Sequence, residues 1–189
     1  MEIYSLQRKQ PMTLTIFTIA YSFASILLRI APHAPNFAPI GALALWSGYY
    51  LPKQYGILVP LATMFISDTI IGFYDTPVMI SVYGSFALVA LIGYTVRSYK
   101  SFPATLMGSL VGSTLFYLAT NFAVWTQSSW YAHTWNGLMW SYTLALPFFR
   151  NTLLSDISYV TVFFGVYALA RYMEKAIHAR QKSVPASVH

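Results

Sequence analysis

The fold is decided by the stretch TNFAVWTQSSWYAHTWNGLMWSYTLALPFFRNTLLSD, residues 120–156, which is the longest interruption between apolar segments. It holds four of the five tryptophans, and polar or charged residues stand at its ends, Asn121 at one and Arg150 and Asp156 at the other. Loops longer than about 12–15 residues are usually functional or disordered, and disordered segments are poor in aromatic residues. We therefore expect residues 122–150 to form an ordered external cap.

The composition is that of an integral membrane protein. Hydrophobic residues make up 57% of the 189 residues and charged residues 8%, and the mean hydropathy is +0.54, whereas soluble domains carry about 25% charged residues. The chain has no cysteine, which excludes disulfides, thiolate metal sites and cysteine nucleophiles. The net charge of +6 does not indicate a nucleic-acid partner, because the basic residues stand singly or in pairs at the ends of apolar runs.

Six apolar runs predict an all-α integral membrane protein with six transmembrane helices. A helix of about 20 apolar residues crosses about 30 Å of hydrocarbon. The runs cover residues 12–30, 37–51, 55–73, 78–96, 102–125 and 152–172. We divide the chain into a cytoplasmic N-terminal segment (1–11), a membrane domain (12–172) and a basic cytoplasmic tail (173–189).

The distribution of lysines and arginines predicts that both termini are cytoplasmic. Six spans place the two termini on one side, and cytoplasmic loops carry an excess of basic residues. In this orientation only Arg29 and Arg150 lie outside. The nine cytoplasmic basic residues are Arg8, Lys9, Lys53, Arg97, Lys100, Arg171, Lys175, Arg180 and Lys182.

Polar residues near the spans gather at the external end. Asp68, Asp75 and Asp156 all lie toward that side, as do the connections 31–39 and 74–77 and the aromatic cap. We therefore expect a binding site on the external face.

Asp68 and Arg150 are the leading candidates for polar anchors of a ligand. A carboxylate at membrane depth costs about 2.5–3.5 kcal/mol on insertion scales, so it faces a partner or a wet cavity. Asp68 therefore either contacts a ligand or forms a structural ion pair with Arg29 or Arg150. The Arg150 guanidinium suits a ligand, and its alternatives are lipid headgroups or a pair with Asp156. We assign Asp156 to the N-terminus of the sixth helix, where an acid is favourable.

Further candidates for binding are a tyrosine, a serine, two asparagines and a tryptophan. Tyr83 and Ser81 lie in the outer half of the fourth span, although tyrosines at this depth are often interfacial anchors. Asn36 and Asn121 either contact a ligand or cap a helix. Trp125 and the other cap tryptophans either form an aromatic belt at the membrane interface or a stacking surface for a ligand with rings.

No motif indicates catalysis or a metal site. His33 and His133 are the external histidines, and imidazoles are common metal ligands, but the two follow no ligand spacing. Walker, HExxH and GxSxG motifs are absent from the sequence. We therefore predict no resident metal, no cofactor and no enzymatic activity, and a ligating role for either histidine stays open.

Several stretches resemble a family of small bacterial membrane proteins. They are APNFAPIGALALWSGYYL, VPLATMFISDTIIGF, YGSFALVALIGY, TNFAVW and LPFFRNTLLSDISY, which together cover roughly residues 29–172. That family is similar to the substrate-binding S components of energy-coupling-factor (ECF) vitamin transporters. The resemblance implies an S-component-like fold in the bacterial cytoplasmic membrane.

Among S-component-like proteins, the chain is most similar to the solitary cobalamin transporters of the BtuM group. The resemblance implies an outward-facing pocket for vitamin B12, with Asp68, Tyr83 and Arg150 at pocket positions. In some members a cysteine near the outer end of the fourth segment ligates cobalt, and that position falls near Ser81. Because this chain has no cysteine, cobalamin would bind through pocket contacts or an external histidine, or the substrate is a different one.

The same resemblance gives a meaning to Ala20 and Ala24, a small-xxx-small pair in the first span. S components use such a patch on their first helix to dock a coupling membrane subunit. We therefore expect the partners to be the lipid bilayer, a vitamin-like ligand and an ECF-type coupling subunit with its ATPases, and no nucleic acid.

These features favour a protein that captures a vitamin-like molecule, with cobalamin or a related corrinoid as the first substrate, and releases it inside the cell. One alternative is an S component for a different vitamin. Another is a structural or assembly subunit of a membrane complex, in which Asp68 and Arg150 pair with each other and no cavity lies beneath the cap. A third is an intramembrane enzyme, which requires a catalytic group and its partner in a wet cavity.

Overall fold

The computed structural model describes residues 12–127 and 129–183, with side chains to residue 179, and these ranges contain helices and no strand. The predicted segment 1–11 and residues 184–189 lie outside the described residues. The helices are α1 (Met12–Ile30), α2 (Ile40–Tyr50), α3 (Lys53–Ile71), α4 (Thr76–Val96), the short 3₁₀ helix η1 (Arg97–Tyr99), α5 (Phe102–Gln127) and α6 (Trp135–Ser183).

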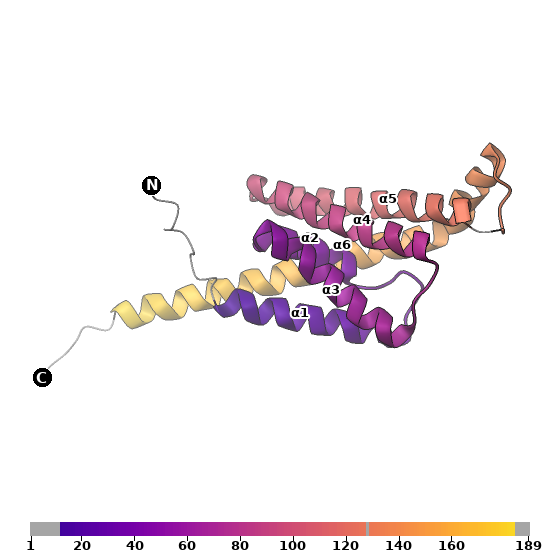
Figure 1. Ribbon diagram of the computed structural model, residues 1–189. Helices are drawn as coiled ribbons and strands as arrows, with labels where there is room; N and C mark the ends of the chain where they lie inside the picture. Colours follow the sequence, from indigo (N-terminus) through magenta and orange to yellow (C-terminus); the bar gives the residue numbers. More distant parts are fainter. Residues whose placement is uncertain (1–11, 128, 184–189) are drawn as a thin grey trace, which may run out of the picture.

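The helices run up and down along one bundle axis (Figure 1). The start of α1 and the end of α6 lie at the same end of the bundle, which we call the terminal end. The connections α1–α2, α3–α4 and α5–α6 lie at the opposite end, which we call the distal end.

Five helices are long and apolar enough to cross a membrane: α1, α3, α4 with η1, α5 and α6. Their outward faces carry large apolar side chains, such as Ile19 on α1 (66% exposed) and Leu58 on α3 (58% exposed). Contact with lipid is favourable for such apolar faces, whereas their exposure to water is unfavourable. The prediction of a helical membrane protein is therefore confirmed at this level.

Helix α2 differs from the predicted set of six spanning helices. Its eleven residues rise only about 16 Å, roughly half the thickness of the hydrocarbon layer. It lies at the centre of the bundle and packs against all five other α-helices. Leu43, Leu45 and Trp46 have no exposed surface. The second passage through the bundle therefore consists of an extended connection, residues 31–39, followed by a short buried helix.

Glycines allow α4 to approach its neighbours closely. A Cβ atom on Gly48 of α2 or on Gly93 of α4 would collide with a backbone carbonyl of the facing helix. Gly108 and Gly112 of α5 face side chains of α4, where an added Cβ would come within 3.1 Å and 2.9 Å of a side-chain carbon. The central helix α2 is therefore fixed against α4 by backbone-to-backbone contact.

The predicted external cap over residues 122–150 is wrong. Helix α5 continues to Gln127 and helix α6 begins at Trp135, so only a short connection separates them. Residues 136–150 contain too many apolar side chains to behave as a loop, and Pro147 stays inside α6 because membrane helices tolerate proline where neighbouring groups satisfy the freed carbonyl. Many of the tryptophans in this stretch therefore stand on helices.

Part of the predicted tail, residues 173–183, is a continuation of helix α6. Helix α6 continues without interruption through Ser183 and is 49 residues long, about 74 Å at the rise of an α-helix. It therefore extends past the other helices at the terminal end (Figure 1). Arg171 and Glu174 form an ion pair on this extension, and Thr13 of α1 donates a hydrogen bond to Glu174 (3.2 Å).

Candidate functional site

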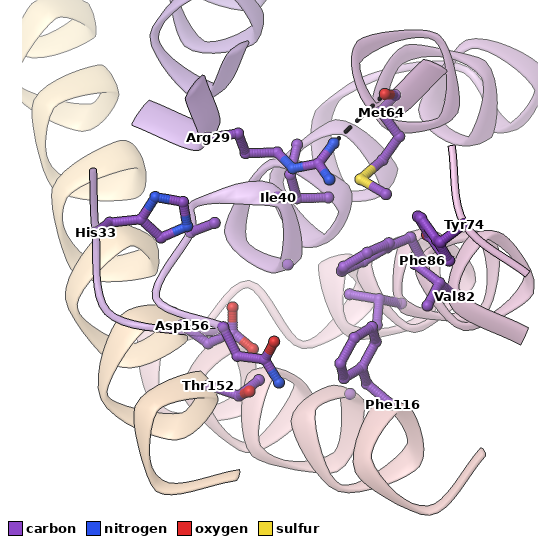
Figure 2. Close-up of a pocket in the computed structure, with 15 residues that line it drawn as sticks. Arg29, His33, Ile40, Met64, Tyr74, Val82, Phe86, Phe116, Thr152 and Asp156 are labelled. Atoms are coloured by element: carbon purple, nitrogen blue, oxygen red, sulfur yellow. Dashed lines mark hydrogen bonds between the residues drawn. The ribbon is translucent and has the colours of Figure 1, made fainter. Parts of the chain in front are cut away.

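A cavity of about 270 Å³ lies within the bundle, in the half toward the distal end. All six α-helices and two connections contribute to its wall (Figure 2). Its polar lining consists of Arg29, His33, Asn36, Tyr74, Thr152 and Asp156. Its apolar lining includes Ile40, Met64, Val82, Phe86, Val89 and Phe116. Pockets for small molecules commonly combine a mainly apolar wall with a few polar groups.

The extended connection 31–39 forms one side of this cavity. Prolines at 32, 35 and 39 prevent a helix here, and Asn36 adopts the left-handed conformation with φ 61°, which asparagine tolerates better than most residues. Two side chains of α6 hold the connection in place: Asn151 donates to the Pro35 carbonyl and Ser155 to the Ala38 carbonyl, both at 2.9 Å.

The first turn of α2 forms the floor of the cavity. Ile40 and Gly41 line it, and no side chain caps the helix at Pro39. The first N–H groups of a helix have no partner within the helix and carry a partial positive charge. The cavity floor is therefore electropositive although it carries no charged side chain.

Asp156 lies beside this floor. Asp156 is 6% exposed, and its Oδ2 lies 2.6 Å from the Ser113 hydroxyl of α5. A Cβ on Gly41 would collide with the Asp156 carboxylate, so only glycine lets the acid approach α2 this closely. Asp156 and Thr152 are four residues apart and share the cavity face of α6.

The assignment of Asp156 to a helix N-terminus is therefore wrong, because α6 begins at Trp135. The acid belongs to the middle of a membrane-spanning helix and lines a cavity. An acid inside an apolar run is by default a functional candidate, and that signal was present in the sequence. It was missed because the predicted cap moved the start of the helix next to Asp156.

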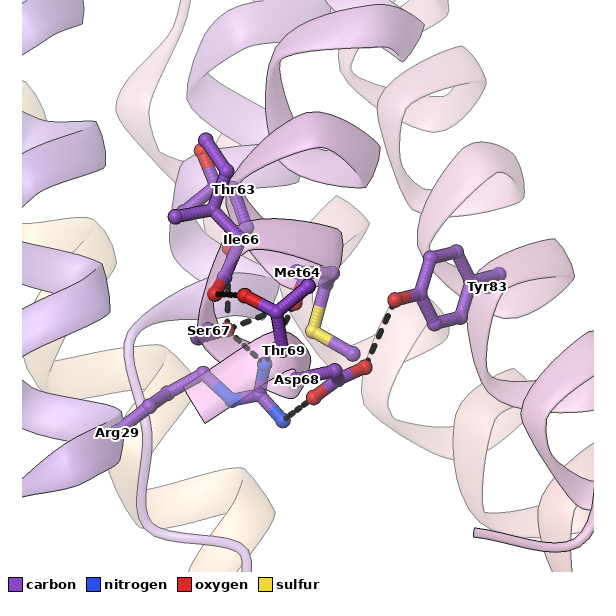
Figure 3. A network of polar contacts seen from close by, with 8 residues as sticks. All are labelled: Arg29, Thr63, Met64, Ile66, Ser67, Asp68, Thr69 and Tyr83. Carbon is purple, nitrogen blue, oxygen red and sulfur yellow. Dashed lines mark hydrogen bonds and ion pairs between the residues drawn. The ribbon is translucent and has the colours of Figure 1, made fainter. Parts of the chain in front are cut away.

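Asp68 forms the ion pair with Arg29, one of its two predicted partners (Figure 3). The Arg29 guanidinium donates to Asp68 Oδ1 at 2.8 Å and also to the Ser67 hydroxyl. Tyr83 donates from its hydroxyl to Asp68 Oδ2 at 2.7 Å. Asp68 is 1% exposed and does not line the cavity, whereas Arg29 does. Asp68 and Tyr83 thus hold Arg29 at the cavity wall and join α1, α3 and α4.

Tyr74, on the α3–α4 connection, adds a neutral hydroxyl to the cavity wall. Burial, followed by the nearby Asp68 carboxylate, raises the pKa of Tyr74 to about 12. The hydroxyl therefore stays protonated at physiological pH and can donate or accept a hydrogen bond.

The remaining predicted binding residues are dispersed. Asn36 lines the main cavity, and Asn121 lines a neighbouring cavity of about 210 Å³ that shares Asn36 with it. Ser81 and Arg150 line neither, and Arg150 is exposed on α6. Trp125 lies near the distal end, where its indole N–H donates to the Ala132 carbonyl at 3.0 Å.

The aromatic residues at the α5–α6 connection face outward. Trp130, Trp135 and Trp140 are 82%, 72% and 60% exposed. Amphipathic rings at the end of a membrane bundle are typical of an interfacial belt. This placement favours the belt over a stacking surface above a ligand.

The two histidines that were predicted to be external occupy different surroundings. His33 lines the cavity, whereas His133 packs against the Trp125 ring with 5.7 Å between the ring centroids. Within residues 12–127 and 129–179, no group of three or more His, Asp or Glu side chains could hold a metal ion. Ala20 is exposed and Ala24 half-buried on α1, so part of the predicted docking patch is open to a partner or lipid.

A family model matches residues 7–180, nearly the whole chain. The chain belongs to DUF6580, a family of unknown function. No curated protein and no solved structure matches it. Family membership therefore assigns no activity, and functional inference depends on the cavity.

Proposed function

We propose that this protein binds a small organic molecule in the cavity and carries it across the membrane in which its helices lie. The observation that carries the proposal is the broken second passage, in which the extended connection 31–39 and the first turn of α2 line a cavity inside the bundle. Non-helical backbone at membrane depth is tolerated where it is buried in protein or lines a wet cavity. Transporters place substrate sites at such interrupted helices.

The cavity also favours binding over a purely structural role. A structural or assembly subunit predicts an ion pair between Asp68 and Arg150 and a filled interior. Instead Asp68 pairs with Arg29, and groups from all six α-helices converge on open space. Maintaining several polar groups around a void costs folding free energy, which is understandable if a ligand fills the void.

The direction proposed is uptake, with the distal end outside and the terminal end in the cytoplasm. Lys53 at the start of α3, Arg97 at the start of η1 and Lys100 before α5 lie at the terminal end. Basic residues of short loops are enriched on the cytoplasmic side. A cavity near the distal end is then placed to collect its ligand from outside a bacterial cytoplasmic membrane.

A vitamin or vitamin precursor is the proposed substrate class. The cavity volume of about 270 Å³ lies near the lower limit of typical ligand pockets, about 300–1,000 Å³, which favours a compact compound. A corrinoid is much larger and would require the main cavity and its neighbour around Asn121 to merge. Cobalamin therefore remains a candidate alongside smaller vitamins, and an ECF-type coupling subunit remains a candidate partner for the α1 face at Ala20 and Ala24.

Binding to a blocked cavity tests the proposal. Purified protein in lipid nanodiscs would be titrated with a vitamin panel, cobalamin included, by calorimetry, and positive compounds would be followed as radiolabelled uptake into proteoliposomes. Val82→Trp would fill the cavity, because Val82 lines both it and its neighbour. Leu88→Trp is the matched control on α4, since Leu88 is 49% exposed on the outer face.

The proposal predicts at least one compound that binds wild type and Leu88→Trp equally and Val82→Trp at least tenfold more weakly. Equal binding to all three proteins would place the ligand elsewhere and overturn the proposal. Binding without uptake in proteoliposomes would contradict independent transport. Uptake restored by an added ATPase module would then support the S-component form of the proposal.

A further inference from the structure

Asp156 is a buried acid without a cationic partner. The ion pairs within the described side chains are Arg29–Asp68 and Arg171–Glu174. Among the side chains of residues 12–127 and 129–179, Asp156 has one hydrogen-bond contact, between Ser113 and its Oδ2, and none at its Oδ1. Its carboxyl group nevertheless lines the cavity. An ionised carboxylate in such surroundings is costly unless something compensates it.

The hydrogen bonds around Ser113 match a protonated Asp156. The Ser113 hydroxyl lies 3.0 Å from the Ser109 carbonyl oxygen and 2.6 Å from Asp156 Oδ2, and a hydroxyl has one proton to donate. If Asp156 is protonated, it donates to Ser113, and Ser113 donates to the Ser109 carbonyl. Both contacts are then satisfied. If Asp156 is ionised, the single hydroxyl proton of Ser113 serves only one of these two contacts, and the other has no hydrogen between its oxygens.

The other charged or titratable groups of the cavity leave Asp156 available. Arg29 is held by Asp68 and Ser67. His33 and Tyr74 lie on the two connections. The cavity residues contributed by α2, α3, α4 and α5 include no charged or titratable side chain. No charged side chain of the cavity therefore competes with an incoming cation for Asp156, and the uncapped N–H groups at the start of α2 favour the ionised form of the acid that the cation needs.

Aromatic side chains form the wall contributed by α4 and α5. Phe86 and Phe116 pack together with 5.1 Å between their ring centroids, and both line the cavity. The faces of aromatic rings attract cations, more strongly when water is excluded. The cavity therefore combines one free acid with aromatic rings in its wall, in a small volume.

We propose that the cavity takes a compact organic cation, a protonated amine or amidine carrying one ring or a short apolar body, with Asp156 as its counter-ion. Asp156 releases its proton to water at the cavity mouth as the cation enters, so that charge in the cavity is conserved. This inference rests on the proposed binding function and narrows its substrate class. It also makes proton and ligand competitors for one site.

Three probes of matched shape test the charge preference: benzylammonium, benzyl alcohol and benzoate. Each would be titrated into the full-length protein in nanodiscs by calorimetry, at several pH values and in buffers of different ionisation enthalpy. We expect benzylammonium to bind at least tenfold more tightly than either other probe. We also expect release of close to one proton per benzylammonium at low pH, and an affinity that rises up to about tenfold per pH unit until Asp156 is ionised.

Asp156→Asn mimics the protonated acid and should abolish benzylammonium binding and proton release. Asp75→Asn, an exposed acid beside the cavity end of α4, is the control and should change neither. His33→Gln shows whether the released proton comes from the histidine instead. Infrared difference spectra of the wild type need no variant: benzylammonium should remove the carbonyl band of a protonated carboxylic acid.

The outcomes separate this inference from the proposed function. Tightest binding of benzoate or benzyl alcohol, lost in Val82→Trp, would retain the binding cavity and overturn the cation preference. Proton release that survives Asp156→Asn, or an unchanged infrared carboxyl band on binding, would overturn the role of Asp156. If neither these probes nor the vitamin panel bind the folded protein, both this inference and the proposed function fail.

Discussion

Asp68 receives contacts from two other helices while it is almost fully buried. Asp68→Asn should destabilise the protein by about 3–5 kcal/mol, because breaking a buried pair leaves the Arg29 charge uncompensated. Tyr83→Phe should cost less, about 1.5–3 kcal/mol, since it removes one hydrogen bond to a charged group. Denaturant unfolding in detergent, followed by circular dichroism, would measure both changes.

The control for this pair is Asp75→Asn. Asp75 is exposed and its side chain does not cap α4, so the stability should change by less than about 0.5 kcal/mol. Equal losses in Asp68→Asn and Asp75→Asn would show that general surface charge, and not the Arg29–Asp68–Tyr83 network, sets the effect.

At the scale of helices, two glycines of α4 offer a matched comparison. A Cβ on Gly93 would meet the backbone of α2, whereas a Cβ on Gly84 would meet nothing. Gly93→Ala should therefore destabilise the bundle by about 1–3 kcal/mol through overpacking. Gly84→Ala should be neutral or stabilising by up to about 1 kcal/mol, because alanine favours helices. Thermal unfolding of both variants would check this, and a neutral Gly93→Ala would contradict the close α2–α4 contact.

The sequence predicts elements well where composition alone decides them. A run of nineteen residues, mainly apolar and with Arg29 near its end, predicts the same bounds for α1 as the structure has, Met12–Ile30. The bounds of α3, α4 and α5 differ from their predicted runs by only a few residues. Helix α6 was cut short because polar and aromatic residues between 135 and 150 were interpreted as loop. Such residues are common on membrane helices near the interface and do not end the helix.

The site was harder to predict than the helices because it depends on tertiary contacts. Asp68 is predicted either to contact a ligand or to form an ion pair, and which arginine it pairs with depends on how α1 and α3 pack. The hydrogen bond from Tyr83 to Asp68 is not predicted from the sequence. Gly41 carries no sequence signal that it faces Asp156. The cavity follows from α2 being short and surrounded on all sides, a property that hydropathy cannot distinguish from a weak span.

At the scale of the whole molecule, the absence of cysteine allows the membrane topology to be tested with single introduced cysteines, because no native cysteine has to be removed first. Ser129→Cys places a thiol on the α5–α6 connection, and Ser98→Cys places one in η1 at the terminal end. Both side chains are exposed. With the distal end outside, a membrane-impermeant maleimide added to intact cells should label Ser129→Cys and spare Ser98→Cys until the membrane is permeabilised. The reverse pattern would invert the proposed orientation and turn uptake into export.

The shortness of α2 has a consequence for biogenesis. The translocon releases segments into lipid according to their apolar length, and the eleven residues of α2, preceded by a proline-rich connection, do not qualify alone. After α1 is released, α2 must wait at the membrane surface or within the protein-conducting channel until α3 and α4 supply the surface that buries it. Lys53 would then reach its proposed cytoplasmic position late. We therefore expect synthesis of this protein to include a change in topology. In truncated nascent chains that end before α4, residue 53 should be accessible from the external side of the membrane.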